Sequence, residues 1–164
     1  QRTWPLGEQA DQLLLQFHQV QNHTDGHAIK AVVAQALAAS GVASMSQGQN
    51  GSTKGEVKST DLAIWSDDLD PWLGNPLLIA IESTISSREH LTSTLHQIAS
   101  RLQKTHTDRG LLLYGTTVFS VQDEAVRFPQ ILVISIEEFL IGLKATSLGD
   151  FLRGKRNTQA HGKG

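Results

Sequence analysis

The chain has 164 residues, 39% of them hydrophobic and 18% charged, which is enough to bury a hydrophobic core in one domain. It contains no cysteine, which excludes a disulfide scaffold, a cysteine-ligated zinc site and a thiol nucleophile. The 14 Lys and Arg against 16 Asp and Glu give a net charge of −2, which excludes a polybasic protein that binds nucleic acid by bulk electrostatics.

The first forty residues predict two helices. Apolar residues recur every three or four positions over residues 5–20 and again over the alanine-rich residues 27–40. Turn-forming residues at 22–26 separate the two segments. The next stretch, 42–60, is rich in Gly, Ser and Gln, and we expect it to hold a loop and a short, weak strand.

Short apolar runs in the rest of the chain predict buried strands. Residues 62–65, 77–81, 110–114 and 131–134 are nearly all apolar, as in strands buried on both faces. Helices are predicted over 88–104 and 137–143, with a last turn over 148–152. This order implies an α/β fold with a mixed central sheet flanked by helices. We expect one domain over 1–150, with 151–164 as a polar tail or the start of a following segment.

Acidic residues accompany two of these strands. Asp61 opens the run 62–65, and the run 77–81 ends in Ile79-Ala80-Ile81-Glu82. This layout resembles the PD-(D/E)xK superfamily, the restriction-endonuclease-like nucleases, over residues 5–140. That family has a core of a helix, a three-strand meander, a helix and a strand. It carries an aspartate at the second strand and a Glu/Asp-x-Lys motif at the third.

The resemblance implies a metal-dependent DNA endonuclease. Its Mg²⁺ or Mn²⁺ ion would polarise the phosphodiester and activate a water molecule. Asp61, Glu82 and the backbone carbonyl of Ile81 would hold the ion, and the family's lysine would orient the water. Gln97, on the helix after the third strand, matches a glutamine that related nucleases carry near the active centre, but Arg101 stands where they have an aromatic residue.

The motif of this chain is incomplete. In one frame Ala80 holds the position of the acid and Glu82 that of the lysine, whereas in the other Glu82 is the acid and Thr84 replaces the lysine. Positions 80, 82 and 84 share one face of a strand, so alternation alone does not choose between the frames. Ala80 predicts little or no cleavage, through natural loss of the site or through an introduced alanine. A lysine elsewhere, such as Lys58, is a third explanation.

Several weaker candidates have two interpretations each. The basic residues Arg88, Arg101, Lys104 and Arg109 either contact phosphates or form a polar helix face. Carboxylates of the connector, and one on the first helix, either bind a further cation or are solvated; these are Asp67, Asp68, Asp70 and Glu8. A zinc site formed by His18, His23 and His27 is disfavoured, because a turn separates them.

Three functions stay open from the sequence. The first is a DNA endonuclease that is inactive as written, and the second is the same fold kept for DNA binding, dimerisation or docking in a larger defence or signalling protein. The third rests on Arg156 and His161, which have the R-x4-H spacing of HEPN ribonucleases. We expect DNA as the partner, and a double-strand cut would suit a homodimer. No apolar stretch is long enough for a membrane span and no secretory leader is visible, so we expect a cytoplasmic protein.

Overall fold

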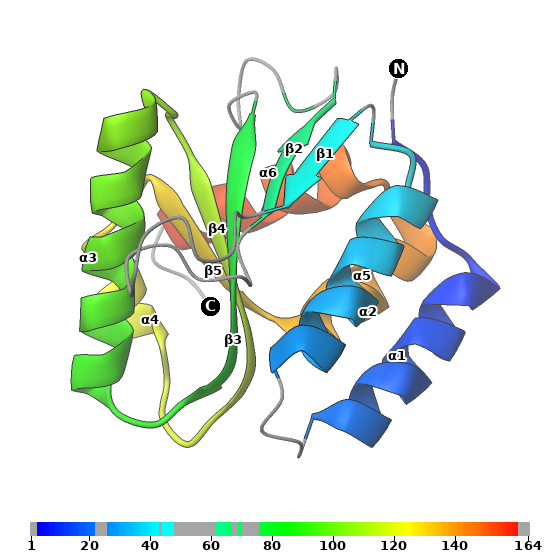
Figure 1. Cartoon of the computed structure of the whole chain (residues 1–164), viewed down its shortest axis with the longest axis horizontal. Coiled ribbons are helices and arrows are strands. Elements are labelled where there is room, and N and C mark those ends of the chain that lie inside the picture. Colours follow the sequence, from blue (N-terminus) through cyan, green and yellow to red (C-terminus); the bar gives the residue numbers. More distant parts are fainter. Residues whose placement is uncertain are drawn as a thin grey trace.

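The structure is a computed structural model that describes residues 3–21, 26–42, 44–47, 62–66, 69 and 76–160. Helices and strands alternate after an N-terminal pair of helices (Figure 1). The elements are α1 Glu8–Val20, α2 Gly26–Ala39, β1 Ser44–Gln47, β2 Leu62–Trp65, β3 Leu77–Ile85, α3 Arg88–Thr105, β4 Gly110–Thr117, α4 Gln122–Ala125, β5 Ile131–Ser135, α5 Ile136–Ala145 and α6 Leu148–Ala160.

The strands expected from the apolar runs are all present. β2, β3, β4 and β5 include the four predicted segments, and β3 and β4 continue to Ile85 and Thr117. The short strand β1 confirms the weak strand expected before residue 60, and α3 matches the helix predicted over 88–104. Among the described helices, none combines the length and the apolar character needed to cross a bilayer.

The five strands form one sheet in the order β1-β2-β3-β4-β5. β1, β2 and β3 pair antiparallel, whereas β3, β4 and β5 are parallel to one another. Parallel neighbours need a crossover connection, and α3 supplies the one between β3 and β4. The predicted mixed sheet flanked by helices is therefore confirmed.

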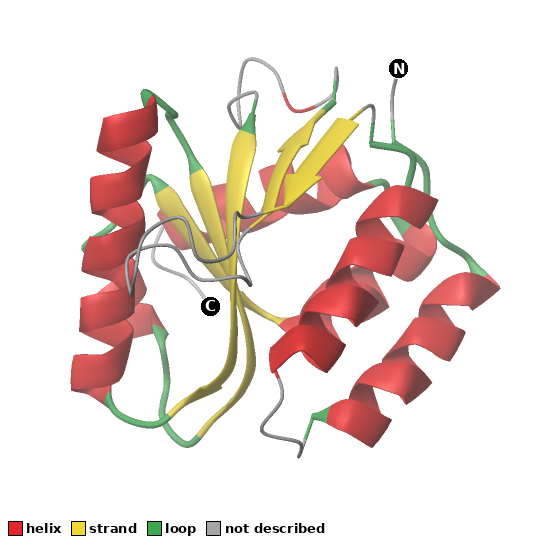
Figure 2. Ribbon diagram, viewed as in Figure 1, coloured by secondary structure: helices red, strands yellow, loops and turns green. Residues whose placement is uncertain are grey.

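Helices cover both faces of the sheet (Figure 2). One face packs against α1, α2, α5 and α6 and forms the larger core, in which Phe17 and Phe139 are almost completely buried. The opposite face packs against α3 through Leu91, Leu95 and Ile98. Because the sheet is covered on both sides, its inner strands are apolar at consecutive positions rather than at alternate ones.

The C-terminal helix α6 is part of the core. Leu148 and Leu152 have no exposed surface, and the ring of Phe151 meets that of Phe139 edge to face. The domain boundary expected at residue 150 therefore falls inside a helix. That helix continues to Ala160, in place of the single turn expected over 148–152.

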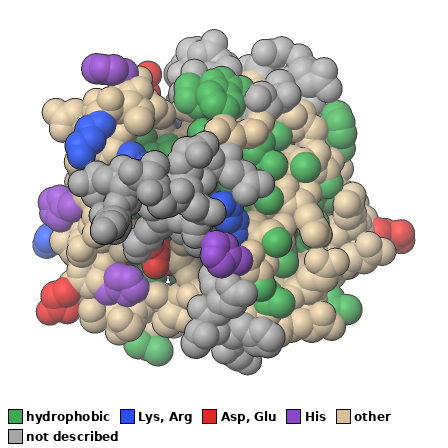
Figure 3. All heavy atoms as spheres, in the orientation of Figure 1, with side chains coloured by type: hydrophobic (Ala, Val, Ile, Leu, Met, Phe, Trp, Pro, Cys, Tyr) green, Lys and Arg blue, Asp and Glu red, His purple; other side chains and the backbone are tan. Residues whose placement is uncertain are grey.

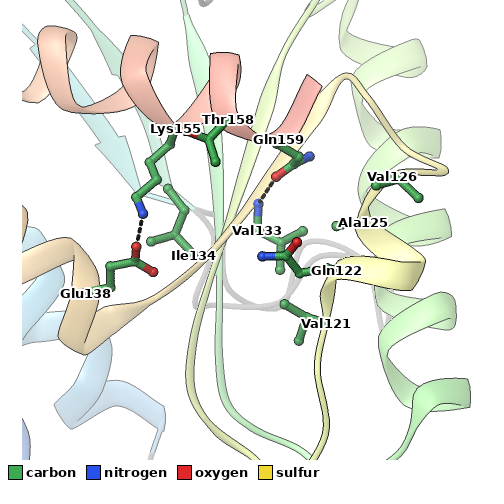
Figure 4. A pocket seen from close by; sticks show the side chains of 10 residues that line it. All are labelled: Val121, Gln122, Ala125, Val126, Val133, Ile134, Glu138, Lys155, Thr158 and Gln159. Atoms are coloured by element: carbon green, nitrogen blue, oxygen red, sulfur yellow. Dashed lines mark hydrogen bonds and ion pairs between the residues drawn. The ribbon is translucent and has the colours of Figure 1, made fainter. Parts of the chain in front are cut away.

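Gln159, near the end of α6, closes an open edge of the sheet. β5 is the last strand, so one row of its backbone groups has no neighbouring strand. The Nε2 of Gln159 donates to the carbonyl of Ile131 at 2.8 Å, and its Oε1 accepts from the N–H of Val133 at 3.3 Å (Figure 4). The amide makes two hydrogen bonds that another strand would make. A cavity of about 100 Å³ lies beside it, between α4, β5 and α6.

The two glycines in the C-terminal helices form a matched pair for a stability test. A Cβ built on Gly142 overlaps the ring of Phe151, whereas one built on Gly154 meets no atom within 4 Å. We expect Gly142→Ala to lower the free energy of unfolding by about 1–3 kcal/mol through overpacking. We expect Gly154→Ala to raise it by about 0.5–1 kcal/mol, because alanine favours a helix. Urea denaturation measures both, and effects of the same sign would contradict the packing of α6.

Candidate functional site

The side chains of β3 are divided between the two faces of the sheet. Ile79 and Ile81 lie in the larger core beneath α1, α2 and α5, whereas Ala80 lies in the core under α3. Glu82 is two positions from Ala80 in the same strand and therefore shares its face. Both motif positions thus face α3.

Glu82 lies where the sheet meets the first turn of α3. Its side chain is 14% exposed, and its Oε1 is 3.7 Å from the Nε2 of His90. Its register partner on β4 is Tyr114, whose side chain is on the same face. Burial raises the pKa of the Tyr114 phenol, because the phenolate would lose hydration. A carboxylate, an imidazole and a phenol are therefore neighbours at this point of the sheet.

The N-terminal cap of α3 holds His90 beside the strand. The Oγ of Ser87 accepts a hydrogen bond from the backbone N–H of His90 at 3.0 Å, as a helix cap does. The imidazole turns back, so that its Nδ1 accepts from the N–H of Ser86 at 3.1 Å and lies 3.3 Å from the Ser86 Oγ. His90 is not among the site residues that the sequence predicts. Its signal is the pair Ser86-Ser87, which starts a helix soon after Glu82.

Asp61, the first predicted metal ligand, lies outside the described residues. Leu62, which follows it in the sequence, pairs with Ile79. Ile79 in turn precedes Ala80. The described start of β2 is therefore closer along β3 to Ala80 than to Glu82.

The described motif positions offer few ligands for a hard cation. Glu82 supplies one carboxylate and Ala80 supplies none, while the side chain of Ile81 faces the opposite core, which leaves its backbone carbonyl. Within the described ranges, no group of three or more His, Cys, Asp or Glu side chains could hold a metal ion. Mg²⁺ binds through carboxylate and other oxygen ligands. The described residues alone therefore do not fit a Mg²⁺ site.

Gln97 and Arg101 lie on the same stripe of α3 as His90. With Thr94 they recur at intervals of three and four residues, which places all four on one side of the helix. Thr94 is buried, Gln97 is exposed and Arg101 is partly buried. Burial lowers the pKa of the Arg101 guanidinium, because the charged form loses hydration. This polar stripe contacts β3 at its His90 end and reaches solvent at Gln97.

Two other basic candidates point away from this stripe. Arg88 donates to Glu124 on α4 at 3.0 Å, and Arg109 donates to the carbonyl of Pro129 at 3.5 Å. Both contacts lead toward α4 and the segment before β5, so these residues do not join Glu82 in one phosphate-binding face. In Figure 3 most of the visible Lys, Arg and His side chains lie on the half of the molecule that holds α3.

The remaining candidates are dispersed. His18 pairs with Glu137 at 3.4 Å, and His27 is exposed on α2. Glu8 lies in the first turn of α1, where a carboxylate interacts favourably with the helix dipole. The residues that fall outside the described ranges are His23, Lys58, Asp67, Asp68, Asp70 and His161.

Comparison of the chain with protein-family models, with curated proteins and with solved structures found no match. The interpretation of the site therefore depends on the residues, register and contacts described above.

Tyr114 provides a test of burial at the site. It is the only tyrosine in the chain, so near-ultraviolet absorbance follows its titration alone. We expect the folded protein to ionise at higher pH than the urea-unfolded chain. Since the folded pKa exceeds the unfolded value of about 10, the linked stability is complete below that value and is lost as the pH rises through the folded pKa. Equal midpoints would contradict the burial, and Tyr114→Phe is the blank.

Proposed function

We propose that this chain is a restriction-endonuclease-like domain of the PD-(D/E)xK type, built for metal-dependent hydrolysis of DNA phosphodiesters. As written it does not cleave, because Ala80 stands where the family carries an acidic ligand. A divalent cation, when bound, supplies the Lewis acid that polarises the phosphate and activates water. Glu82 and the carbonyl of Ile81, together with Asp61, would hold it.

The order and direction of the strands support the proposal. Helices precede a meander of three antiparallel strands, β1 to β3. The crossover helix α3 then leads to β4, which pairs parallel with β3. This is the helix, meander, helix and strand arrangement that the resemblance implies.

The observation that carries the proposal is the register between β2 and β3. Leu62 follows Asp61 and pairs with Ile79, so the strand that the family's aspartate opens begins beside Ala80. Ala80 and Glu82 then present adjacent positions of one strand face toward α3. The register favours the frame in which Ala80 replaces the acid and Glu82 replaces the lysine.

The packing around Ala80 favours the second candidate function, a non-catalytic module. Its side chain is 5% exposed and packs among apolar residues of α3 and β4. A domain of this fold that holds no cation would serve DNA binding, dimerisation or docking in a larger protein. The two functions differ in whether a restored carboxylate restores metal binding and cleavage.

The third candidate, an RNA-cleaving HEPN motif, needs a test that leaves α6 in place. Arg156 lies on α6, and His161 lies outside the described residues. Deleting residues 150–164 would remove Leu152 from the core and Gln159 from the edge of β5, so the domain would lose stability whatever its function. Arg156→Ala removes the motif without removing the helix, and RNA cleavage that depends on Arg156 would favour this candidate.

Ala80→Glu tests the nuclease proposal directly. We expect Mg²⁺-dependent nicking of plasmid DNA, absent with EDTA and absent from the unsubstituted chain, because a second carboxylate beside Glu82 completes the ligand set. Ala80→Gln has the same size without the charge and should stay inactive. Since position 80 is buried, Ala80→Asp is measured in parallel as a smaller acid, and thermal unfolding establishes that each variant folds.

The same variants test metal binding. In Mn²⁺-soaked crystals of Ala80→Glu we expect anomalous density between Glu82 and the carbonyl of Ile81, and its loss when Glu82→Gln is added. Folded Ala80→Glu and Ala80→Asp proteins that show neither nicking nor Mn²⁺ density would overturn the nuclease proposal in favour of the non-catalytic module.

A further inference from the structure

We propose that His90 is a positioning residue for Glu82, and that its Nε2–H is the nitrogen donor of this site, where Glu82 stands in place of the family's lysine. The consequence for cleavage rests on the proposed function. The contact between His90 and Glu82 does not, because it follows from how α3 starts beside β3.

The hydrogen bonds of His90 determine which ring nitrogen carries the proton. Its Nδ1 accepts from the backbone N–H of Ser86 at 3.1 Å. A ring nitrogen that accepts a hydrogen bond carries no proton, so in the neutral imidazole the proton is on Nε2. Nε2 is the atom that faces the Oε1 of Glu82. A donor is therefore directed at a carboxylate.

The same hydrogen bond separates this role from that of a metal ligand. A neutral histidine binds a metal through its unprotonated nitrogen. In His90 that nitrogen is Nδ1, which already accepts from Ser86, whereas Nε2 is protonated on the side of Glu82. His90 thus orients the carboxylate while Glu82 meets the cation, the arrangement of a second group that supports a ligand.

The donor is held by the helix cap and is open to solvent. Ser87 Oγ accepts from the N–H of His90 at 3.0 Å, and the N–H of Leu91 donates to the carbonyl of Ser87 at 3.1 Å. These bonds fix the backbone from which the imidazole extends. The side chains of His90 and Glu82 are 32% and 14% exposed, so the pair lies at the rim of the core.

The 3.7 Å between Nε2 and Oε1 is longer than a direct hydrogen bond. Such contacts are often long in an unliganded site and shorten when the site is engaged. The orientation of the Glu82 carboxylate then depends on a donor whose tautomer is set by Ser86.

Nitrogen NMR of the imidazoles tests the tautomer in the unsubstituted protein. The His90 signals are assigned by their loss in His90→Gln, and we expect the pattern of a proton on Nε2. Ser86→Ala keeps the backbone N–H and should keep this tautomer. A proton on Nδ1 would overturn the proposal.

The coupling to Glu82 has its own control. Glu82→Ala should shift the Nε2 signal of His90, whereas Glu89→Ala, which removes an exposed carboxylate in the same turn of α3, should leave it in place. An Nε2 signal that does not respond to Glu82→Ala would show that the two side chains do not interact, and would overturn the proposal.

The effect on cleavage is measured in the Ala80→Glu background. His90→Ala should lower the nicking rate roughly 10–100-fold, the usual loss when a group that supports a ligand is removed. His90→Gln replaces the ring but keeps an N–H donor of similar reach, so it should retain most of the rate. Equal losses in the two variants, with matching thermal stability, would indicate a merely structural ring and overturn the proposal.

The outcomes separate this inference from the proposed function. If Ala80→Glu does not nick DNA, the nuclease proposal fails, while the two NMR measurements still decide whether His90 positions Glu82. If Ala80→Glu nicks DNA and His90→Ala nicks as fast, the nuclease proposal stands and the role of His90 fails.

Discussion

The burial of β3 on both faces is the constraint on which the rest of this structure depends. The strand sits between two helical layers, so its odd-numbered residues 77–81 pack against α1, α2 and α5. Its even-numbered positions face α3. Any chemistry at positions 80 and 82 must share that face with the packing of α3. The pair Ala80 and Glu82 divides the two tasks, since alanine packs in the core while glutamate lies nearer its rim.

The start of α3 connects this packing to the site. Because Ser87 caps the helix immediately after β3, the first turn of α3 lies over the end of the strand. A side chain in that turn can reach the carboxylate of Glu82, and His90 does so. The same helix carries Thr94, Gln97 and Arg101 along one stripe. A single helix start thus determines which polar groups surround the candidate site.

The opposite edge of the sheet shows how the domain is completed. A last strand exposes backbone groups that attract other strands, and proteins commonly cover or blunt such an edge. Here the amide of Gln159 satisfies backbone groups of Ile131 and Val133, and Leu152 joins the core from the same helix. The C-terminal helix is therefore an integral layer of the fold, and its polar composition reflects an amphipathic helix with one exposed side.

By itself the sequence determined the strands, the main helices and the shared face of positions 80 and 82. These follow from apolar runs and from periods of 2 and 3.6 residues, which are local properties of the backbone. It did not determine that α6 belongs to the core, that Leu62 pairs with Ile79, or that His90 lies beside Glu82. Register and cross-element contacts depend on how distant segments pack together, and local periodicity carries no information on that packing. Only the tertiary structure therefore decided which groups meet at the candidate site.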